Sequence, residues 1–407
     1  MQEAIQTLSA GNLDILAEAG LLQTTKETVK SLFQIQVYSG LLFFADFMPR
    51  QHPPDLVLPI GPSGKYLASV TIREPVNTAL DLGCGCGIQA LLMAQHTQHV
   101  TATDINPRAL ALTKLNARLN GFPNIEVLEG SYFEPLRGRT FDLVVANLPY
   151  VLNPDNTYVY RDMSQGGDTA IRHTVEQMPS YLNEGGYAHM MLNWVHRADQ
   201  PWWQPIEAWT QRRNADAWIM YSRSQTPEEY AENWIMLSEQ ATPNEYAQTK
   251  ERWLKWYQAQ RIERIGLGLL TFRRRTSDTN WRCSVSIRQI SDETLGEYIL
   301  HLFKNQDRLS RINGHSALLK RKLLPWNMKI ESPSPETRIA RTTRGFLIQK
   351  EILSATATVI GQLDGRRKLA EFMQGISVHP KDGLNLHEEV LEEITLLINL
   401  GMIEPIE

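Results

Sequence analysis

The sequence predicts an α/β protein built on a seven-stranded, mostly parallel sheet with helices on both faces. From Val76 onward, short apolar segments alternate with amphipathic helical segments, which is the pattern of a parallel sheet with crossover helices. The first apolar segment ends in a glycine-rich turn, and a carboxylate ends the next one. Together these observations predict a Rossmann-like domain.

The chain has 407 residues, which is too long for one ordinary core. We expect a helical module over residues 1–75, because Leu13, Leu16, Ala17 and Leu21 recur at helical spacing. The sheet domain should cover residues 76–290. A C-terminal domain should follow over residues 291–407.

The expected elements of the sheet domain follow from apolar runs, caps and breakers. We expect strands at residues 76–82, 99–103, 124–128, 141–146, 187–192, 217–221 and 264–272. Helices should lie at residues 89–96, 107–120 and 174–182. Two further helices, 227–237 and 243–260, each begin with Thr-Pro-x-Glu and form an insertion at about 226–260. That insertion either caps a substrate site or only packs against the sheet. Likewise, the many tryptophans of this part of the chain either form the wall of a substrate site or are buried in the core.

The C-terminal domain should begin with a helix at residues 291–305, and residues 324–336 read as a proline-punctuated link or turn. From about residue 345 we expect a short strand and then helices at 355–363, 368–373 and 388–400. That order predicts a small winged-helix-like domain.

Composition excludes several classes of protein. The net charge of −4 provides no global basic field for nucleic acid, although a local basic patch is compatible with it. Three cysteines cannot build a disulfide framework and suit a reducing compartment. The N-terminus does not resemble a signal peptide, and the least charged stretch, 31–45, is too short to cross a bilayer. We therefore expect a cytoplasmic protein with no membrane partner and no metal.

The glycine-rich turn covers Asp81-Leu82-Gly83-Cys84-Gly85-Cys86-Gly87. Glycines allow positive φ and close approach of a ligand, and the helix that follows offers free N–H groups to a carboxylate. Asp81 can attract an ammonium group. S-adenosylmethionine carries both charges, so it fits this turn. Dinucleotide binding is the competing interpretation, but its third glycine would fall at position 88, which is isoleucine.

A second carboxylate strengthens the cofactor interpretation. Asp104 ends the next predicted strand, 21 positions after Gly83, where it can accept both ribose hydroxyl protons. It could instead cap the helix that opens near Pro107.

The fourth predicted strand ends in Asn147-Leu148-Pro149-Tyr150, on the same rim as the turn. The Asn147 side-chain oxygen and the Leu148 carbonyl can accept the two N–H groups of a planar nitrogen, and Tyr150 can stack on a flat acceptor. The alternative is an Asn-x-Pro turn with Tyr150 in the core.

Residues 76–195 resemble the small-domain class I methyltransferases, the superfamily of the release-factor glutamine methyltransferases. Segments 101–110 and 130–136 are typical of it. In that family Asn-Pro-Pro-Tyr binds the nitrogen to be methylated, which is a glutamine amide, adenine N6 or guanine N2. The resemblance implies catalytic roles for residues 147–150. It implies cofactor contacts from Asp81, Gly83, Cys84, Gly85, Gly87, Asp104, Ile105, Ser131, Tyr132 and Asn147.

Two residues depart from the family pattern. Leu148 replaces the first proline of the motif, which restores an N–H and frees one φ angle. Ser131 stands where many relatives have an acidic residue near the adenine. The longer match is similar to a bacterial branch that is common in actinobacteria.

Six residues are candidates for substrate binding. The segment after the motif has little periodicity, and such loops often close on substrate. The polar residues of this segment either pair with charged groups of the substrate or hold the loop through local hydrogen bonds. Asn193 and Trp194 end the next predicted strand on the same rim. The candidates are Tyr150, Tyr160, Arg161, Asp168, Asn193 and Trp194.

We expect N-methylation of an amide or amino nitrogen in a peptide or protein. The alternatives are a base nitrogen of RNA or DNA, a free amino acid or specialised metabolite, and a non-catalytic binding protein. Residues 345–403 resemble winged-helix modules that recognise peptides. A stabilising domain or a nucleic-acid winged helix are the other interpretations of this segment. Oligomeric state does not follow from the sequence.

Overall fold

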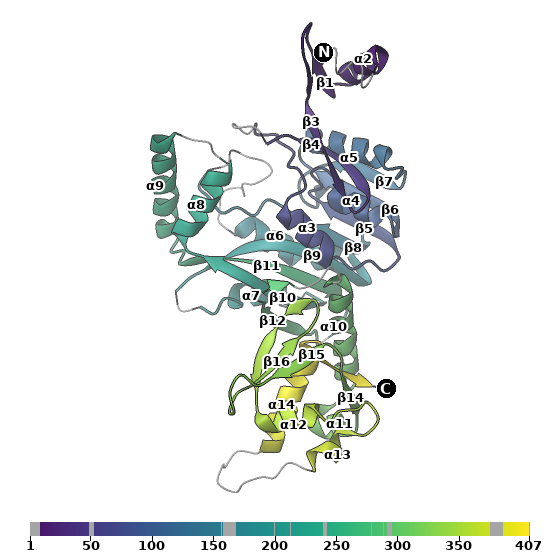
Figure 1. Cartoon of the computed structure of the whole chain (residues 1–407), viewed down its shortest axis with the longest axis vertical. Helices are drawn as coiled ribbons and strands as arrows, with labels where there is room; N and C mark the ends of the chain where they lie inside the picture. Colours follow the sequence, from purple (N-terminus) through teal and green to yellow (C-terminus); the bar gives the residue numbers. More distant parts are fainter. Residues whose placement is uncertain are drawn as a thin grey trace. The chain divides into compact units, whose positions relative to one another are not determined.

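A computed structural model describes residues 9–48, 53–155, 157, 168–198, 200–211, 213–238, 242–277, 279–287, 289–290, 295–374 and 386–406. The chain divides into two compact units, shown in Figure 1. The first contains residues 1–68, 74–219 and 223–280, and the second contains residues 69–73, 220–222 and 281–407.

The central sheet has eight strands in the order β12-β10-β11-β9-β8-β5-β6-β7. Their bounds are β5 Val76–Leu82, β6 Thr97–Asp104, β7 Ile125–Glu129, β8 Phe141–Ala146, β9 Leu182–His196, β10 Ala215–Gln225, β11 Arg264–Arg274 and β12 Arg282–Ser286. Strands β7, β6, β5, β8 and β9 run parallel to one another, and β11 runs antiparallel to β9. The predicted α/β class is confirmed. The predicted count of seven strands is wrong by one, because the short strand β12 follows the segment we expected to be the last.

Helices flank the strands in the predicted alternation. They are α3 Pro62–Val70, α4 Ile88–Ala94, α5 Pro107–Leu119, α6 Thr169–Gln177, α7 Gln204–Thr210, α8 Pro227–Ser238 and α9 Pro243–Ala259, with single turns η1 Glu134–Leu136 and η2 Met178–Tyr181. Asn106 caps α5 ahead of Pro107, and Thr242 forms a capping box with Glu245 at α9. An apolar core lies between α4, α5 and the N-terminal strands.

The N-terminal segment corrects our expectation of a helical module. Helix α2 (Ala10–Glu18) is followed by two hairpins, β1 (Leu22–Thr24) with β2 (Val29–Ser31) and β3 (Phe33–Tyr38) with β4 (Leu41–Asp46). Side chains of β3 alternate in exposure, as a strand requires. The Asn116 amide bonds both backbone groups of Phe44, at 2.8 and 3.0 Å. The hairpin is thus held against α5 by tertiary contacts, which helical spacing in α2 did not reveal.

The second unit combines helices with small antiparallel sheets. Its helices are α10 Leu295–Ser310, α11 Gly314–Leu318, α12 Ser354–Ile360, α13 Leu369–Met373 and α14 Leu386–Asn399. Its strands are β13 Gln289–Ile290, β14 Lys322–Pro325, β15 Met328–Glu331, β16 Arg338–Thr342, β17 Phe346–Leu347, β18 Gln349–Ile352 and β19 Ile403–Ile406. They pair as β13-β17, β14-β19 and β15-β16-β18. Residues 324–336, expected to link or turn, therefore contribute half of β14 and all of β15.

Within the ranges described above, no helix is long and apolar enough to span a membrane. The same residues contain no group of three or more His, Cys, Asp or Glu side chains arranged to hold a metal ion.

Candidate active site

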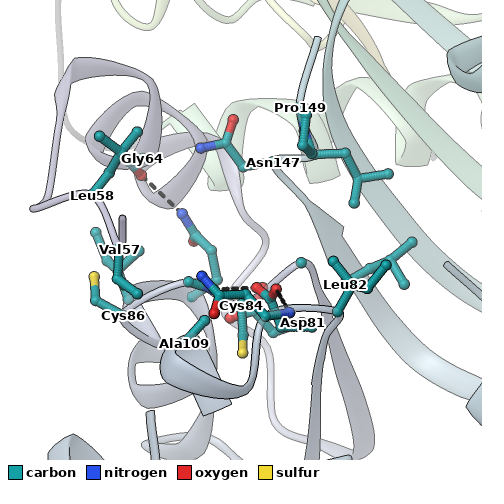
Figure 2. A pocket seen from close by; sticks show the side chains of 18 of the residues that line it. Val57, Leu58, Gly64, Asp81, Leu82, Cys84, Cys86, Ala109, Asn147 and Pro149 are labelled. Atoms are coloured by element: carbon teal, nitrogen blue, oxygen red, sulfur yellow. Dashed lines mark hydrogen bonds between the residues drawn. The ribbon is translucent and has the colours of Figure 1, made fainter. Parts of the chain in front are cut away.

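A cavity of about 530 Å³ opens at the carboxyl ends of β5, β6 and β8. This volume lies within the usual range for small-molecule sites, about 300–1,000 Å³. Residues from the glycine-rich turn, from Asp104 and from the Asn147–Tyr150 motif all line it. Figure 2 shows Asp81, Cys84, Asn147 and Pro149 around this space. The fold therefore brings the predicted cofactor loop and acceptor motif together, as parallel strand ends require.

The glycine-rich turn needs its glycines. Gly83, Gly85 and Gly87 have φ values of +78°, +55° and +84°, in the left-handed region that disfavours other residues. The backbone N–H groups of Gly83 and Cys84 both donate to the Thr103 carbonyl, at 2.9 Å. This anchors the turn to the end of β6 and leaves its open side toward the cavity.

The buried carboxyl group of Asp81 and the half-buried one of Asp104 flank the turn. Asp81 accepts a hydrogen bond from the Ala90 amide at 2.9 Å, and burial raises its pKa to about 7. Asp104 accepts from the Gly85 and Asn106 amides, each at 2.9 Å and each on a different oxygen. Burial also raises the pKa of Asp104. Each oxygen of Asp104 keeps one lone pair for a further donor, which fits a pair of ribose hydroxyls.

Cys84 and Cys86 contribute buried thiols to the turn. Burial raises the pKa of Cys84 well above its usual range and that of Cys86 to about 12. Both thiols are therefore neutral near pH 7, and neither is poised as a nucleophile. Their role in this turn is packing and backbone placement.

The side chain of Asn147 places a buried oxygen, with no hydrogen-bond donor from the described residues, at the cavity. Its Nδ2 donates to Ser63 Oγ at 3.4 Å, while Oδ1 is buried and has no hydrogen-bond partner in the described part of the chain. A buried acceptor without a donor costs free energy, about 1–3 kcal/mol. A substrate N–H would satisfy it.

An aromatic pair forms the acceptor side of the cavity. Tyr150 and Trp234 meet edge to face with ring centroids 6.2 Å apart, and both line the cavity. Burial raises the pKa of Tyr150, whose hydroxyl also bonds Ser63. Trp234 belongs to α8, so the predicted insertion supplies a wall of the cavity as well as packing.

Three further predicted cofactor residues reach the cavity, whereas Gly87, also predicted to bind the cofactor, is not among the residues that line it. Ile105, Ser131 and Tyr132 line it. The Ile105 side chain is 57% exposed and that of Tyr132 is 39% exposed, which leaves both apolar surfaces available to a ligand. Tyr132 has a φ of +47°, a conformation that costs free energy in a non-glycine residue and is common at ligand sites.

Other predicted substrate residues lie elsewhere. Tyr160 and Arg161 fall outside the described residues. Asp168, Asn193 and Trp194 are not among the residues that line the cavity, contrary to our expectation of a shared pocket. Asn193 donates to the Tyr230 hydroxyl at 2.7 Å, and Trp194 is fully buried with its N–H on the Trp202 carbonyl at 2.7 Å. Asp168 Oδ2 accepts from the Val195 amide at 3.4 Å.

The sequence interpretation missed a second strip of the cavity wall. Residues 56–61, Ser63 and Gly64 line it ahead of and within α3, and Gln89 holds the Gly64 carbonyl at 2.9 Å (Figure 2). The breakers Pro59, Gly61 and Pro62 marked a loop here, but nothing in their spacing placed that loop over the sheet.

The insertion also fixes the backbone that follows the acceptor motif. Tyr257 donates its hydroxyl to the Leu152 carbonyl at 2.7 Å, and the Leu152 amide donates to the Tyr230 hydroxyl at 3.2 Å. Asp155 accepts from the Trp253 ring N–H at 2.8 Å and pairs with Arg252. Helices α8 and α9 thus hold residues 152–155 in place.

Comparison with known proteins agrees with this geometry. Residues 63–198 match the family model of the methyltransferase small domain. The release factor glutamine methyltransferase of Geobacter sulfurreducens is 31% identical over 181 residues, covering 41% of this chain and 61% of that protein. That of Vibrio cholerae is 34% identical over 169 residues, covering 38% and 57%. The ribosomal protein uL3 glutamine methyltransferase of Xanthomonas campestris is 30% identical over 199 residues, covering 42% and 62%.

The chain thus spans less than two thirds of the length of these curated relatives. The match covers the turn, Asp104 and the Asn147–Tyr150 motif. Residues 63–198 are therefore similar to the methyltransferase small domain and to the release factor glutamine methyltransferases.

Proposed function

We propose that the protein transfers a methyl group from S-adenosylmethionine to an amide or amino nitrogen of a peptide or protein side chain. The observation that carries the proposal is the buried Asn147 Oδ1, which lines the cavity and lacks a donor among the described residues. Relatives named as glutamine methyltransferases of release factors and of a ribosomal protein support an amide acceptor.

The geometry suggests how the chain's own residues would act. Asp104 would accept the ribose hydroxyls, Asp81 would face the ammonium group, and the left-handed glycines would let the backbone approach the methionine part. The cofactor supplies an electrophilic methyl group on a sulfonium. Asn147 Oδ1 and the Leu148 carbonyl would each accept one N–H of the acceptor nitrogen and support the positive charge that it develops.

Methyl transfer would leave the acceptor nitrogen with a positive charge, and the nitrogen would then give one proton to solvent. Tyr150 and Trp234 would hold a flat acceptor group between the motif and α8. Because relatives are named as methyltransferases of release factors and of a ribosomal protein, we also propose that the enzyme works in the cytoplasm.

The test uses lysate from a strain that lacks the protein. Purified full-length protein and methyl-tritiated S-adenosylmethionine are added, and the lysate is separated into protein, nucleic acid and small molecules. The proposal expects label in protein, and none with Asn147→Ala protein that still binds cofactor. Label in RNA or DNA would instead support base methylation, and label in small molecules would support a metabolite acceptor.

A further inference from the structure

Two runs of three basic residues, 320–322 and 366–368, lie against each other in the second unit. Lys322 of β14 forms an antiparallel bridge with Lys368, just ahead of α13. Figure 1 shows β14, α11 and α13 in the same part of this unit. Three backbone hydrogen bonds join the runs, from Leu369 to Arg321 at 2.8 Å, Ala370 to Leu319 at 2.9 Å and Gly365 to Leu323 at 3.1 Å.

Most of these charges have no counterion among the described residues. Arg367 pairs with Asp364 at 2.9 Å and lies over the Phe372 ring. The other five make no ion pair within the described ranges, and all but the half-buried Arg321 are exposed. We call these five the basic surface: Lys320, Arg321, Lys322, Arg366 and Lys368.

Holding these cations together costs stability. Like charges directly opposite on paired strands repel, as Lys322 and Lys368 do here. The whole chain carries a net charge of −4, so this concentration of positive charge is local and does not reflect overall composition. An anionic partner would remove the repulsion.

The basic surface is open rather than pocket-shaped where Arg321 lies. A hollow that Arg321 shares with Arg308 and Arg311 has a volume of about 30 Å³, far below the about 300–1,000 Å³ of ordinary small-molecule sites. Contact must therefore be made along the exposed side chains.

We propose that the basic surface binds the phosphate backbone of a nucleic acid. Lys320 and Arg321 lie in the turn directly before β14, Lys322 begins that strand, and Lys368 lies across the bridge from it, so the cations gather at one end of β14. Guanidinium groups add bidentate contacts to phosphate oxygens. This docking is separate from the methyl-transfer site and does not depend on which acceptor that site uses.

The test is fluorescence anisotropy of full-length protein with a labelled single-stranded RNA of about 20 nucleotides. Five phosphate contacts give a slope of log K against log salt of about −3.5, so affinity should fall roughly 100-fold between about 50 and 200 mM salt. The triple variant Lys320→Gln, Lys322→Gln, Arg366→Gln should reduce the slope to about −1.4. DNA of equal length, run in parallel, separates backbone binding from preference for RNA.

The matched control removes three exposed charges elsewhere in the unit, Lys329→Gln, Arg344→Gln and Lys350→Gln. It has the same net charge as the test variant and should bind RNA like the wild type. Circular dichroism and thermal unfolding check that each variant is folded. The proposal fails if wild-type binding does not depend on salt, if both triple variants weaken alike, or if a polyglutamate of equal charge displaces the RNA equally well.

Discussion

Gly83 is the position where the cofactor turn and the acceptor motif touch, and replacing it with alanine tests that contact. An alanine at φ +78° costs about 1–2 kcal/mol. Its Cβ would lie 2.9 Å from Leu148 Cδ2, so the buried Leu148 must leave its rotamer at a further cost of about 0.5–1.5 kcal/mol. We expect Gly83→Ala to lower the free energy of unfolding by about 1.5–3.5 kcal/mol in total, since these two costs add.

Gly85→Ala is the matched control. Gly85 has a φ of +55°, but a Cβ there meets nothing within 4 Å, so only the backbone cost of about 1–2 kcal/mol applies. Because Gly85 lines the cavity, its variant should instead lose cofactor affinity.

Urea unfolding followed by tryptophan fluorescence measures both variants, since most of the ten tryptophans lie in the first unit. Equal losses of stability in the two variants would show that Leu148 does not approach the turn as described. Calorimetry with S-adenosylmethionine measures the cofactor affinity of each variant.

Three further predictions concern the cofactor and acceptor sides of the cavity. Burial raises the pKa of Asp81 to about 7, so below that pH its carboxyl is protonated and must lose a proton before it can face an ammonium group. The Kd for S-adenosylmethionine should therefore fall about tenfold per pH unit as the pH rises toward 7, and it should level off above that pH. Calorimetry at a series of pH values measures this, and the Asp81→Asn variant should show no such pH dependence. Asp104→Asn should weaken cofactor binding by about 10- to 100-fold, because an oxygen that accepts hydrogen bonds is replaced by an NH₂ group that faces the Gly85 or Asn106 amide. Unchanged cofactor affinity would contradict the proposal that Asp104 binds the ribose. Trp234→Ala should raise the KM for the acceptor and leave cofactor affinity unchanged, because the Trp234 ring packs edge to face with Tyr150 on the acceptor side. Steady-state kinetics with the labelled acceptor fraction measures both constants, and a change in the KM for the cofactor instead would contradict this placement.

The sequence predicts the rim of the cavity well because local rules fix it. The turn at Gly83 and Gly85 needs positive φ, and Asp104 and Asn147 each follow a strand with an unmistakable apolar pattern. In a parallel sheet those strand ends meet on one edge, so their neighbourhood follows from topology alone.

What the sequence leaves open depends on contacts between distant residues. Ser63 reaches Asn147 across 84 positions, and Trp234 reaches Tyr150 from an inserted helix. No local spacing encodes either contact. Asn193 and Trp194 lie near the carboxyl end of β9, as predicted. However, Asn193 bonds Tyr230 and Trp194 bonds Trp202, and neither residue lines the cavity.

The N-terminal error has a different cause. The helical spacing of Leu13, Leu16 and Ala17 is real and lies in α2, but we extended it through residues that follow the two-residue period of a strand. Gln34 and Gln36 alternate with Phe33, Ile35 and Val37, which is the two-residue repeat of a strand.

The central claim is that the acceptor is a side-chain nitrogen of a protein, and the chemical form of the transferred methyl group tests it most directly. Acid hydrolysis of an N-methylated side-chain amide releases methylamine, whereas a methyl ester releases methanol and a methylated base keeps its label. We predict that protein labelled by the wild-type enzyme releases tritiated methylamine on hydrolysis, or yields a tritiated N-methyl amino acid if the acceptor is an amine. Label recovered as methanol or in nucleosides would contradict the account.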